Sequence, residues 1–183
     1  MEIIARRTYL DAINQWLGKN LIIVLTGQRR VGKSCILKLL AENCRQSGNV
    51  IYIDKEKHQF EDIQDYRDLN AYIDERIVNG QTNYIIIDEV QTITEFEKTL
   101  RSFYSEDNVE VIVSGSNAKM LSSELTTVIA GRYKEIYVQP LSYTEFMTFH
   151  NLPDSETTLM SYIEYGGMPG LATVGWDKNG SPE

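Results

Sequence analysis

The sequence feature that most limits the possible folds is a glycine-framed loop between an apolar run and an amphipathic run. Residues 21–26 read LIIVLT, as expected of a strand that is buried on both faces. The next eight residues, GQRRVGKS at 27–34, match the pattern G-x-x-x-x-G-K-[ST]. The two glycines allow a tight turn in which successive N–H groups face a phosphate, and the following helix, predicted over 33–45, points the positive end of its dipole there. The pattern predicts a triphosphate-binding loop.

Particular side chains of this loop have distinct expected roles. We expect Lys33 to contact the β- and γ-phosphate oxygens and the Ser34 hydroxyl to bind Mg²⁺. Arg29 and Arg30 give the loop a positive mouth that suits a phosphate tail, or they contact another domain or partner. The complete set of predicted nucleotide-binding residues is Gly27, Gln28, Arg29, Arg30, Val31, Gly32, Lys33, Ser34 and Cys35.

A second apolar run ends in two carboxylates. Residues 84–88 form a predicted strand that finishes at Asp88, and Glu89 follows directly. A carboxylate at the tip of a central strand beside the phosphate loop is suited to hold Mg²⁺, so we assign Asp88 to the metal. Glu89 is then placed to polarise an attacking water, which indicates hydrolysis. The alternative is an acidic pair that ends a strand and faces solvent.

The rest of the chain alternates β-rich runs with helical periodicities, the pattern of an α/β fold with a mostly parallel sheet. The five predicted strands are 21–26, 50–54, 84–88, 109–114 and 133–138. Helices are predicted at 8–17, 33–45, within 63–77, and at 96–104, 143–150 and 156–165. We expect a nucleotide-binding core over 1–140, a helical extension over 141–175 and a frayed tail over 176–183.

Three residues outside the loop and the acidic pair are further site candidates. Ser116 and Asn117 follow the fourth strand, where they either touch the γ-phosphate or attacking water or serve only as turn residues. Arg132, just before the fifth strand, reaches phosphate in its own subunit, acts on a neighbouring subunit or pairs with a surface carboxylate.

Composition and charge exclude several classes of protein. The net charge of −8 argues against a domain that binds nucleic acid through overall charge, yet residues 1–48 hold eight basic and only three acidic side chains. This local excess predicts an anion near the amino-terminal quarter. No apolar stretch reaches the roughly 20 residues of a membrane helix, and no secretory signal is evident, so we expect a cytoplasmic protein without membrane contact.

Several segments together resemble the AAA-type ATPase domain of a large prokaryotic family of ATP-binding proteins. They are LTGQRRVGKS, YIIIDEVQ, VIVSGSNAKMLSSELTTVIAGRY, PLSYTEF and YIEYGGMPG, and the resemblance spans about residues 3–170. Membership implies a three-layer P-loop NTPase fold with strand order 5-1-4-3-2 and Mg²⁺-ATP as ligand. It also implies a metal role for Asp88, catalysis by Glu89, a sensor role near Ser116 or Asn117 and nucleotide sensing by Arg132.

The motifs and the resemblance together predict an ATPase domain of slow turnover. Such family members usually carry a further carboxy-terminal domain of unknown function, which we expect to be missing from these 183 residues. ATP turnover is then expected to drive that domain or a protein partner, and a homo-oligomer is possible. The absence of an N-K-x-D motif favours ATP over GTP. The alternatives are a module that binds ATP without hydrolysis and, less favoured, a P-loop kinase.

Overall fold

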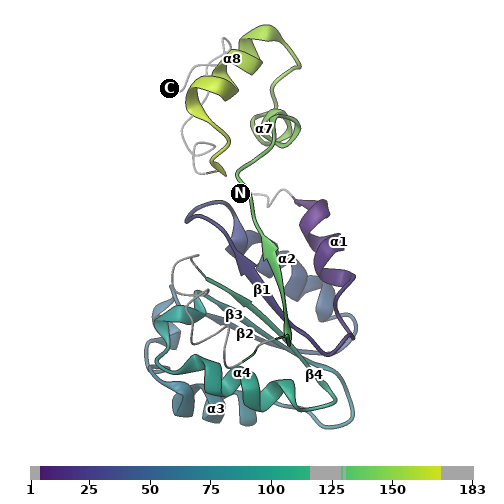
Figure 1. Cartoon of the computed structure of the whole chain (residues 1–183), viewed down its shortest axis with the longest axis vertical. Coiled ribbons are helices and arrows are strands. Elements are labelled where there is room, and N and C mark those ends of the chain that lie inside the picture. Colours follow the sequence, from purple (N-terminus) through teal and green to yellow (C-terminus); the bar gives the residue numbers. More distant parts are fainter. Residues whose placement is uncertain (1–4, 116–128, 130, 170–183) are drawn as a thin grey trace.

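The computed structural model describes residues 5–115, 129 and 131–169. Its centre is a parallel sheet of five strands in the order β2-β3-β4-β1-β5 (Figure 1). The strands are β1 (Ile22–Thr26), β2 (Asn49–Asp54), β3 (Asn83–Asp88), β4 (Val109–Ser114) and β5 (Tyr133–Tyr137). This order is 5-1-4-3-2 when read from the other edge, so the predicted topology is confirmed.

The strand sequences explain why the sheet is covered on both faces. In β1, Ile22 and Val24 face one hydrophobic core, whereas Ile23 and Leu25 face a second core on the opposite side. All five residues of this strand are buried, as its continuous apolar run predicts. Since successive side chains of a strand point to opposite faces, one short run supplies both cores.

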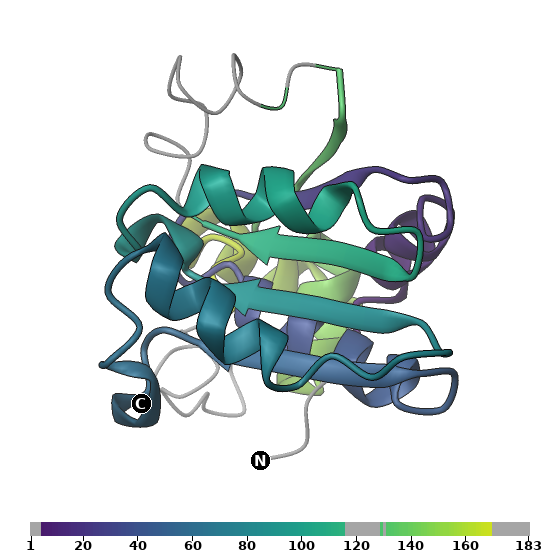
Figure 2. The same cartoon turned by 90° about the horizontal axis from the view of Figure 1, so that it is seen from below.

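Four helices form the two outer layers. On one face lie α3 (Tyr66–Asp74) and α4 (Phe96–Tyr104), and on the other lie α1 (Arg7–Asn14) and α2 (Lys33–Cys44). Figure 2 shows α3 and α4 in front of the sheet and α1 and α2 behind it. Two short 3₁₀ turns, η1 (His58–Phe60) and η2 (Val90–Thr92), join these layers to the sheet. The predicted three-layer architecture is therefore confirmed.

Two further helices lie beyond the sheet, past the end of β5 (Figure 1). They are α7 (Tyr143–His150) and α8 (Glu156–Tyr165), with the bounds that the sequence predicts. Serine side chains cap both, since Ser142 accepts a hydrogen bond from the Glu145 N–H and Ser155 accepts one from the Thr158 N–H. The segments on either side of these two helices meet, because the Leu141 N–H donates to the Gly167 carbonyl at 2.6 Å.

The amino-terminal helix and the third helix are shorter than their predicted ranges. Helix α1 ends at Asn14 and the chain leaves through Gly18, which adopts a φ of 74°. Helix α3 begins only after Asp65, which forms a capping box with Asp68. Within the described ranges, the helices are all too short or too polar to span a lipid bilayer.

Candidate functional site

The predicted phosphate loop leaves β1 and enters α2 with a backbone that requires both of its glycines. Gly27 has a φ of 140° and Gly32, the N-cap of α2, has a φ of 98°. A Cβ atom at Gly27 would collide with the carbonyl oxygen of Val138, so the close approach of the chain just after β5 also demands glycine. The N-cap residue Gly32 has no side chain that could accept hydrogen bonds from the first turn of α2, so the N–H groups of this turn can face an anion.

The tip of the loop is exposed while its second half is anchored. Gln28, Arg29 and Arg30 lie at the surface, and Arg30 adopts a left-handed φ of 67°. Val31 is fully buried in the core on the α2 side. The loop thus presents two arginines at its mouth above a fixed base, in agreement with a polyanion ligand.

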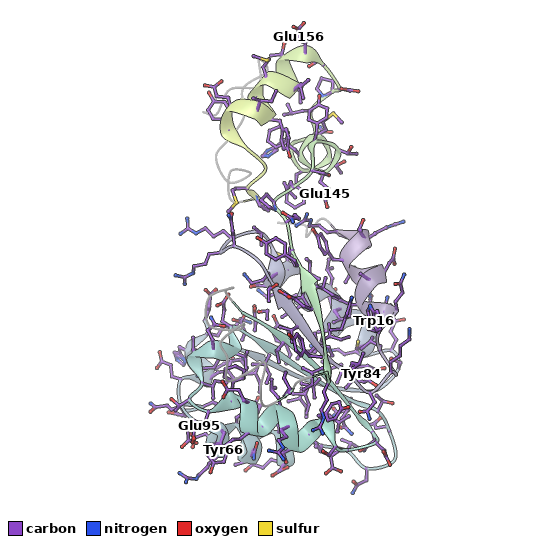
Figure 3. The ribbon with its side chains drawn as sticks, in the orientation of Figure 1. Trp16, Tyr66, Tyr84, Glu95, Glu145 and Glu156 are labelled. Atoms are coloured by element: carbon purple, nitrogen blue, oxygen red, sulfur yellow. The ribbon has the colours of Figure 1, made fainter. Side chains whose placement is uncertain are left out.

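A buried arginine outside the loop holds this base in place. Arg6 donates from Nη1 to the Val31 carbonyl at 3.1 Å and to the Gln139 carbonyl at 2.8 Å. Its Nε and Nη2 atoms lie 2.8 and 2.9 Å from the two carboxylate oxygens of Glu145 on α7. One guanidinium therefore joins the phosphate loop, the segment after β5 and α7. We call these contacts the Arg6 clasp (Figure 3, where Glu145 is labelled at the junction of α7 with the body below).

Lys33 is buried, and its amine is held by acceptors that a phosphate would replace. Nζ donates to the carbonyls of Gly27 at 3.1 Å and Gln28 at 3.0 Å. It also lies 4.0 Å from Oε1 of Glu89. The lysine side chain is only 4% exposed. The amine thus already points into the curve of the loop, toward the place where the motif expects the β- and γ-phosphates.

Asp88 ends β3 as a fully buried carboxylate. Its Oδ1 accepts a hydrogen bond from the Ser114 hydroxyl, and its Oδ2 is buried without a hydrogen-bond partner among the described residues. Burial raises the pKa of Asp88, while the hydroxyls of Ser114 and Ser34 act against that rise. A buried carboxylate oxygen without a partner, next to a serine hydroxyl, fits a hydrated Mg²⁺, which is commonly held by one or two protein oxygens together with substrate phosphates.

Glu89 follows Asp88 in a strained backbone conformation that turns its side chain toward Lys33. It adopts a φ of 57° and a ψ of 47°, and its N–H donates to the Ser114 hydroxyl oxygen at 3.1 Å. Its Oε2 accepts a hydrogen bond from Nε2 of Gln91. Non-glycine residues in left-handed conformations concentrate at functional sites, and Glu89 fits this rule.

The structure therefore brings the main predicted site residues together. Lys33 and Ser34 on α2 meet Asp88 and Glu89 at the carboxyl end of β3. Cys35 lies at the surface of α2. Ser116 and Asn117 lie outside the described residues.

Arg132 lies just before the amino-terminal end of β5, whereas the phosphate loop follows the carboxyl end of β1 in the same parallel sheet. Its carbonyl accepts a hydrogen bond from Ile22 at the start of β1, and the next residue, Tyr133, is level with Ile22 in the parallel register. At about 3.3 Å per residue, the five residues from Ile22 to Gly27 separate this level from the phosphate loop by about 17 Å. The guanidinium instead lies 5.6 Å from the ring centre of Tyr104. This placement does not support contact between Arg132 and a phosphate bound at the loop of its own chain.

Three contributors to the site were missed by the sequence interpretation. Ser114 binds Asp88 and the Glu89 N–H, but a serine at a strand end has no distinguishing pattern. Gln91 lies two residues after Glu89, and a contact between this amide and the acidic pair could have been predicted from their closeness in sequence. Arg6 meets Glu145 across 139 positions of sequence, and no local pattern links them.

Comparison with known protein families identifies the domain. A family model described as an AAA domain matches residues 19–147. The chain belongs to this AAA-domain family. A relative from Haemophilus influenzae, an uncharacterized protein, is 33% identical over 179 residues, which cover 92% of this chain and 44% of that protein. An uncharacterized protein of Methanocaldococcus jannaschii is 26% identical over 166 residues, 85% of this chain and 37% of that protein. The chain thus spans less than half the length of these relatives.

Solved structures with a similar fold include the replication initiator DnaA and an ORC1 protein. DnaA bound to AMPPCP and single-stranded DNA gives a TM-score of 0.62 at 14% identity, covering 94% of this chain and 60% of that one. The Aeropyrum pernix ORC1 protein in complex with DNA gives 0.58 at 12% identity, covering 80% of this chain and 49% of that one. At such identities the similarity establishes an AAA-type ATPase fold and nothing finer.

Proposed function

We propose that this domain binds Mg²⁺-ATP and hydrolyses it, with Glu89 as the general base. The observation that carries the proposal is the separation of 4.0 Å between the Lys33 amine and a Glu89 carboxylate oxygen. It supports a site in which a γ-phosphate held by Lys33 lies beside a carboxylate that can accept a proton. The DnaA structure of similar fold from Aquifex aeolicus is bound to AMPPCP, an observation that supports a nucleotide ligand here as well.

Binding depends on groups that already surround the phosphate position. The N–H groups of the first α2 turn and the Lys33 amine would bind the phosphate oxygens. Asp88 and Ser34 would hold Mg²⁺, which neutralises the charge that develops on the transferred phosphoryl group when it is bound. The loss of hydrogen bonds from Lys33 to Gly27 and Gln28 is offset by charge-assisted bonds to phosphate, which are stronger.

The proposed chemical step is attack of a water on the γ-phosphorus. A bond forms between the water oxygen and phosphorus, the bond from phosphorus to the β–γ bridging oxygen breaks, and a water proton moves to the carboxylate of Glu89. The products are ADP and inorganic phosphate. The Lys33 amine stabilises charge on the oxygens that depart with ADP.

The direct test is steady-state phosphate release by the wild-type chain and by Glu89→Gln. The proposal expects Mg²⁺-dependent release from the wild type and a fall of about 10² or more in Glu89→Gln, the usual contribution of a general base. Equal rates in the two proteins, or release that persists in EDTA, would refute the hydrolytic assignment. Transfer of the phosphoryl group to a metabolite or nucleic-acid end in place of water would indicate a kinase.

A second candidate function is a nucleotide-controlled binding module, and the Arg6 clasp favours it. Because Arg6 contacts both the loop at Val31 and helix α7 at Glu145, a movement of the loop on nucleotide binding would also displace α7. Tight Mg²⁺-ATP binding by calorimetry without any phosphate release would select this function. In either case, since the chain covers less than half of its relatives, we propose that nucleotide controls a segment or partner beyond the AAA domain.

Assembly and surroundings form the last part of the proposal. Arg132 would act on the nucleotide of a second copy, because it is remote from its own loop. A net charge of −8 argues against direct nucleic-acid binding by this domain. The free thiols of Cys35, exposed, and Cys44, buried, are compatible with a reducing cytoplasm.

A further inference from the structure

We propose that Gln91 positions Glu89 for hydrolysis by holding one of its carboxylate oxygens so that the other faces Lys33 and the γ-phosphate. The inference rests on the proposed ATPase function and adds a residue to it. Nε2 of Gln91 donates to Oε2 of Glu89. The other oxygen, Oε1, is the atom that lies 4.0 Å from Nζ of Lys33. The two oxygens of the carboxylate are thus divided between an amide and the phosphate-binding lysine.

The direction of the amide follows from the chemistry of its partner. An ionised carboxylate only accepts hydrogen bonds, so the nitrogen of the Gln91 amide, and not its oxygen, must face Glu89. Among the described residues, Glu89 is the one hydrogen-bond partner of the Gln91 side chain. Gln91 cannot accept a proton at neutral pH, and it makes no hydrogen bond to the phosphate loop. A role in positioning is therefore the one that its contacts support.

The backbone around Gln91 is built to keep this geometry. Glu89, with its left-handed φ of 57°, is the N-cap of η2, and Gln91 is the middle residue of that turn. Val90 between them is fully buried, and the Thr92 hydroxyl donates to the Glu89 carbonyl at 2.9 Å. Because the turn is fixed at both ends, the side chains of Gln91 and Glu89 are held close to each other.

The second polar atom of the amide also points to a role in turnover. Oε1 of Gln91 is buried and lacks a donor among the described residues. A buried acceptor without a donor is unfavourable, so this oxygen is expected to gain a donor in another state of the protein. A water that donates to this oxygen would hold the amide with its nitrogen facing Glu89.

The test compares steady-state hydrolysis by the full 183-residue chain and by Gln91→Met, which keeps the volume but removes the amide. We expect kcat to fall at least tenfold while KM and the Kd for ADP stay within about twofold, because the lost contact acts on the carboxylate and not on the nucleotide. Gln46→Met is the matched control, because it makes the same substitution at an exposed position beyond the end of α2, and it should retain kcat within about twofold.

The double variant Glu89→Gln/Gln91→Met separates positioning from an independent effect. If Gln91 acts through Glu89, the double variant should be no slower than Glu89→Gln alone. A further tenfold loss in the double variant, an unchanged kcat in Gln91→Met, or an equal loss in Gln46→Met would each overturn the inference. Absence of turnover in the wild type would overturn the proposed hydrolysis and this inference with it, whereas wild-type turnover that Gln91→Met does not alter would overturn the inference alone. Thermal melting of each variant identifies any that fails to fold, and Gln91→Leu then replaces Gln91→Met.

Discussion

Removal of the Arg6 guanidinium should destabilise the whole domain. Arg6→Met keeps much of the apolar stem but deletes the bonds to the Val31, Gln139 and Pro140 carbonyls and the ion pair with Glu145. Arg6 is 5% exposed and Glu145 is 28% exposed, so the pair is largely withdrawn from water. Removing one partner of a buried ion pair costs about 3–5 kcal/mol, because the remaining charge is left without compensation.

The exposure of Glu145 sets the loss at the lower end, about 3 kcal/mol, because water can replace part of the lost bonding. For a domain of this length each kcal/mol corresponds to about 2–4 °C in Tm, so the expected drop is about 6–12 °C. Thermal unfolding by circular dichroism measures it, with Arg7→Met as the control, since Arg7 is the adjacent arginine, at the start of α1, and is exposed. Equal Tm values for Arg6→Met and Arg7→Met would refute the argument that the clasp holds the loop to α7.

Three further perturbations test separate parts of the structure. Gly27→Ala should lower the free energy of unfolding in urea by more than Gly80→Ala, for which the expected loss is roughly 1–2 kcal/mol. Both glycines have a positive φ, but of the two only Gly27 lies where a Cβ would meet a backbone carbonyl. Asp88→Asn should make the nucleotide-free protein more stable at pH 7, because burial raises the pKa of this carboxyl and its charge opposes folding. Mg²⁺-dependent phosphate release should be lost in the same variant. A less stable variant would contradict the first expectation. Burial alone would raise the pKa of Glu145, but hydrogen bonds from Arg6 and Ser142 lower this pKa below its ordinary 4.5. The stability that ionised Glu145 supplies is therefore complete above pH 4.5 and is lost as the pH falls through the lowered pKa. The difference in Tm between wild type and Glu145→Gln should therefore be constant from pH 7 to 4.5 and shrink below it.

The elements that could be predicted are those with a local cause. The apolar runs of β1 and β3 exclude exposed positions, and Ser142 and Ser155 mark the starts of α7 and α8 by capping them. The phosphate loop was predictable because two glycines, a lysine and a serine at fixed spacing are required by one ligand. The order of the strands came from family resemblance, since nothing in a strand's own sequence names its neighbours.

The parts that could not be predicted depend on contacts between distant segments. The Arg6 clasp joins positions 6 and 145, and the role of Ser114 depends on β4 lying beside β3. Arg132 is a different case. A residue that precedes a parallel strand lies at the amino-terminal end of the strands, opposite the phosphate loop. That placement could have been deduced from the predicted topology, which does not favour phosphate contact within the same chain.

The most direct test of the account is the binding of ATP, ADP and AMP to the wild-type chain and to Lys33→Ala, measured by calorimetry in the presence of Mg²⁺. The buried Lys33 amine and the uncapped start of α2 are arranged for the outer phosphates. The account predicts that ATP and ADP bind far more tightly than AMP. It also predicts that Lys33→Ala weakens ATP binding at least tenfold, since a hydrogen bond to a charged group contributes about 1.5–3 kcal/mol. Equal affinity of the two proteins for ATP, or affinity for AMP that matches that for ATP, would contradict a triphosphate site at this loop.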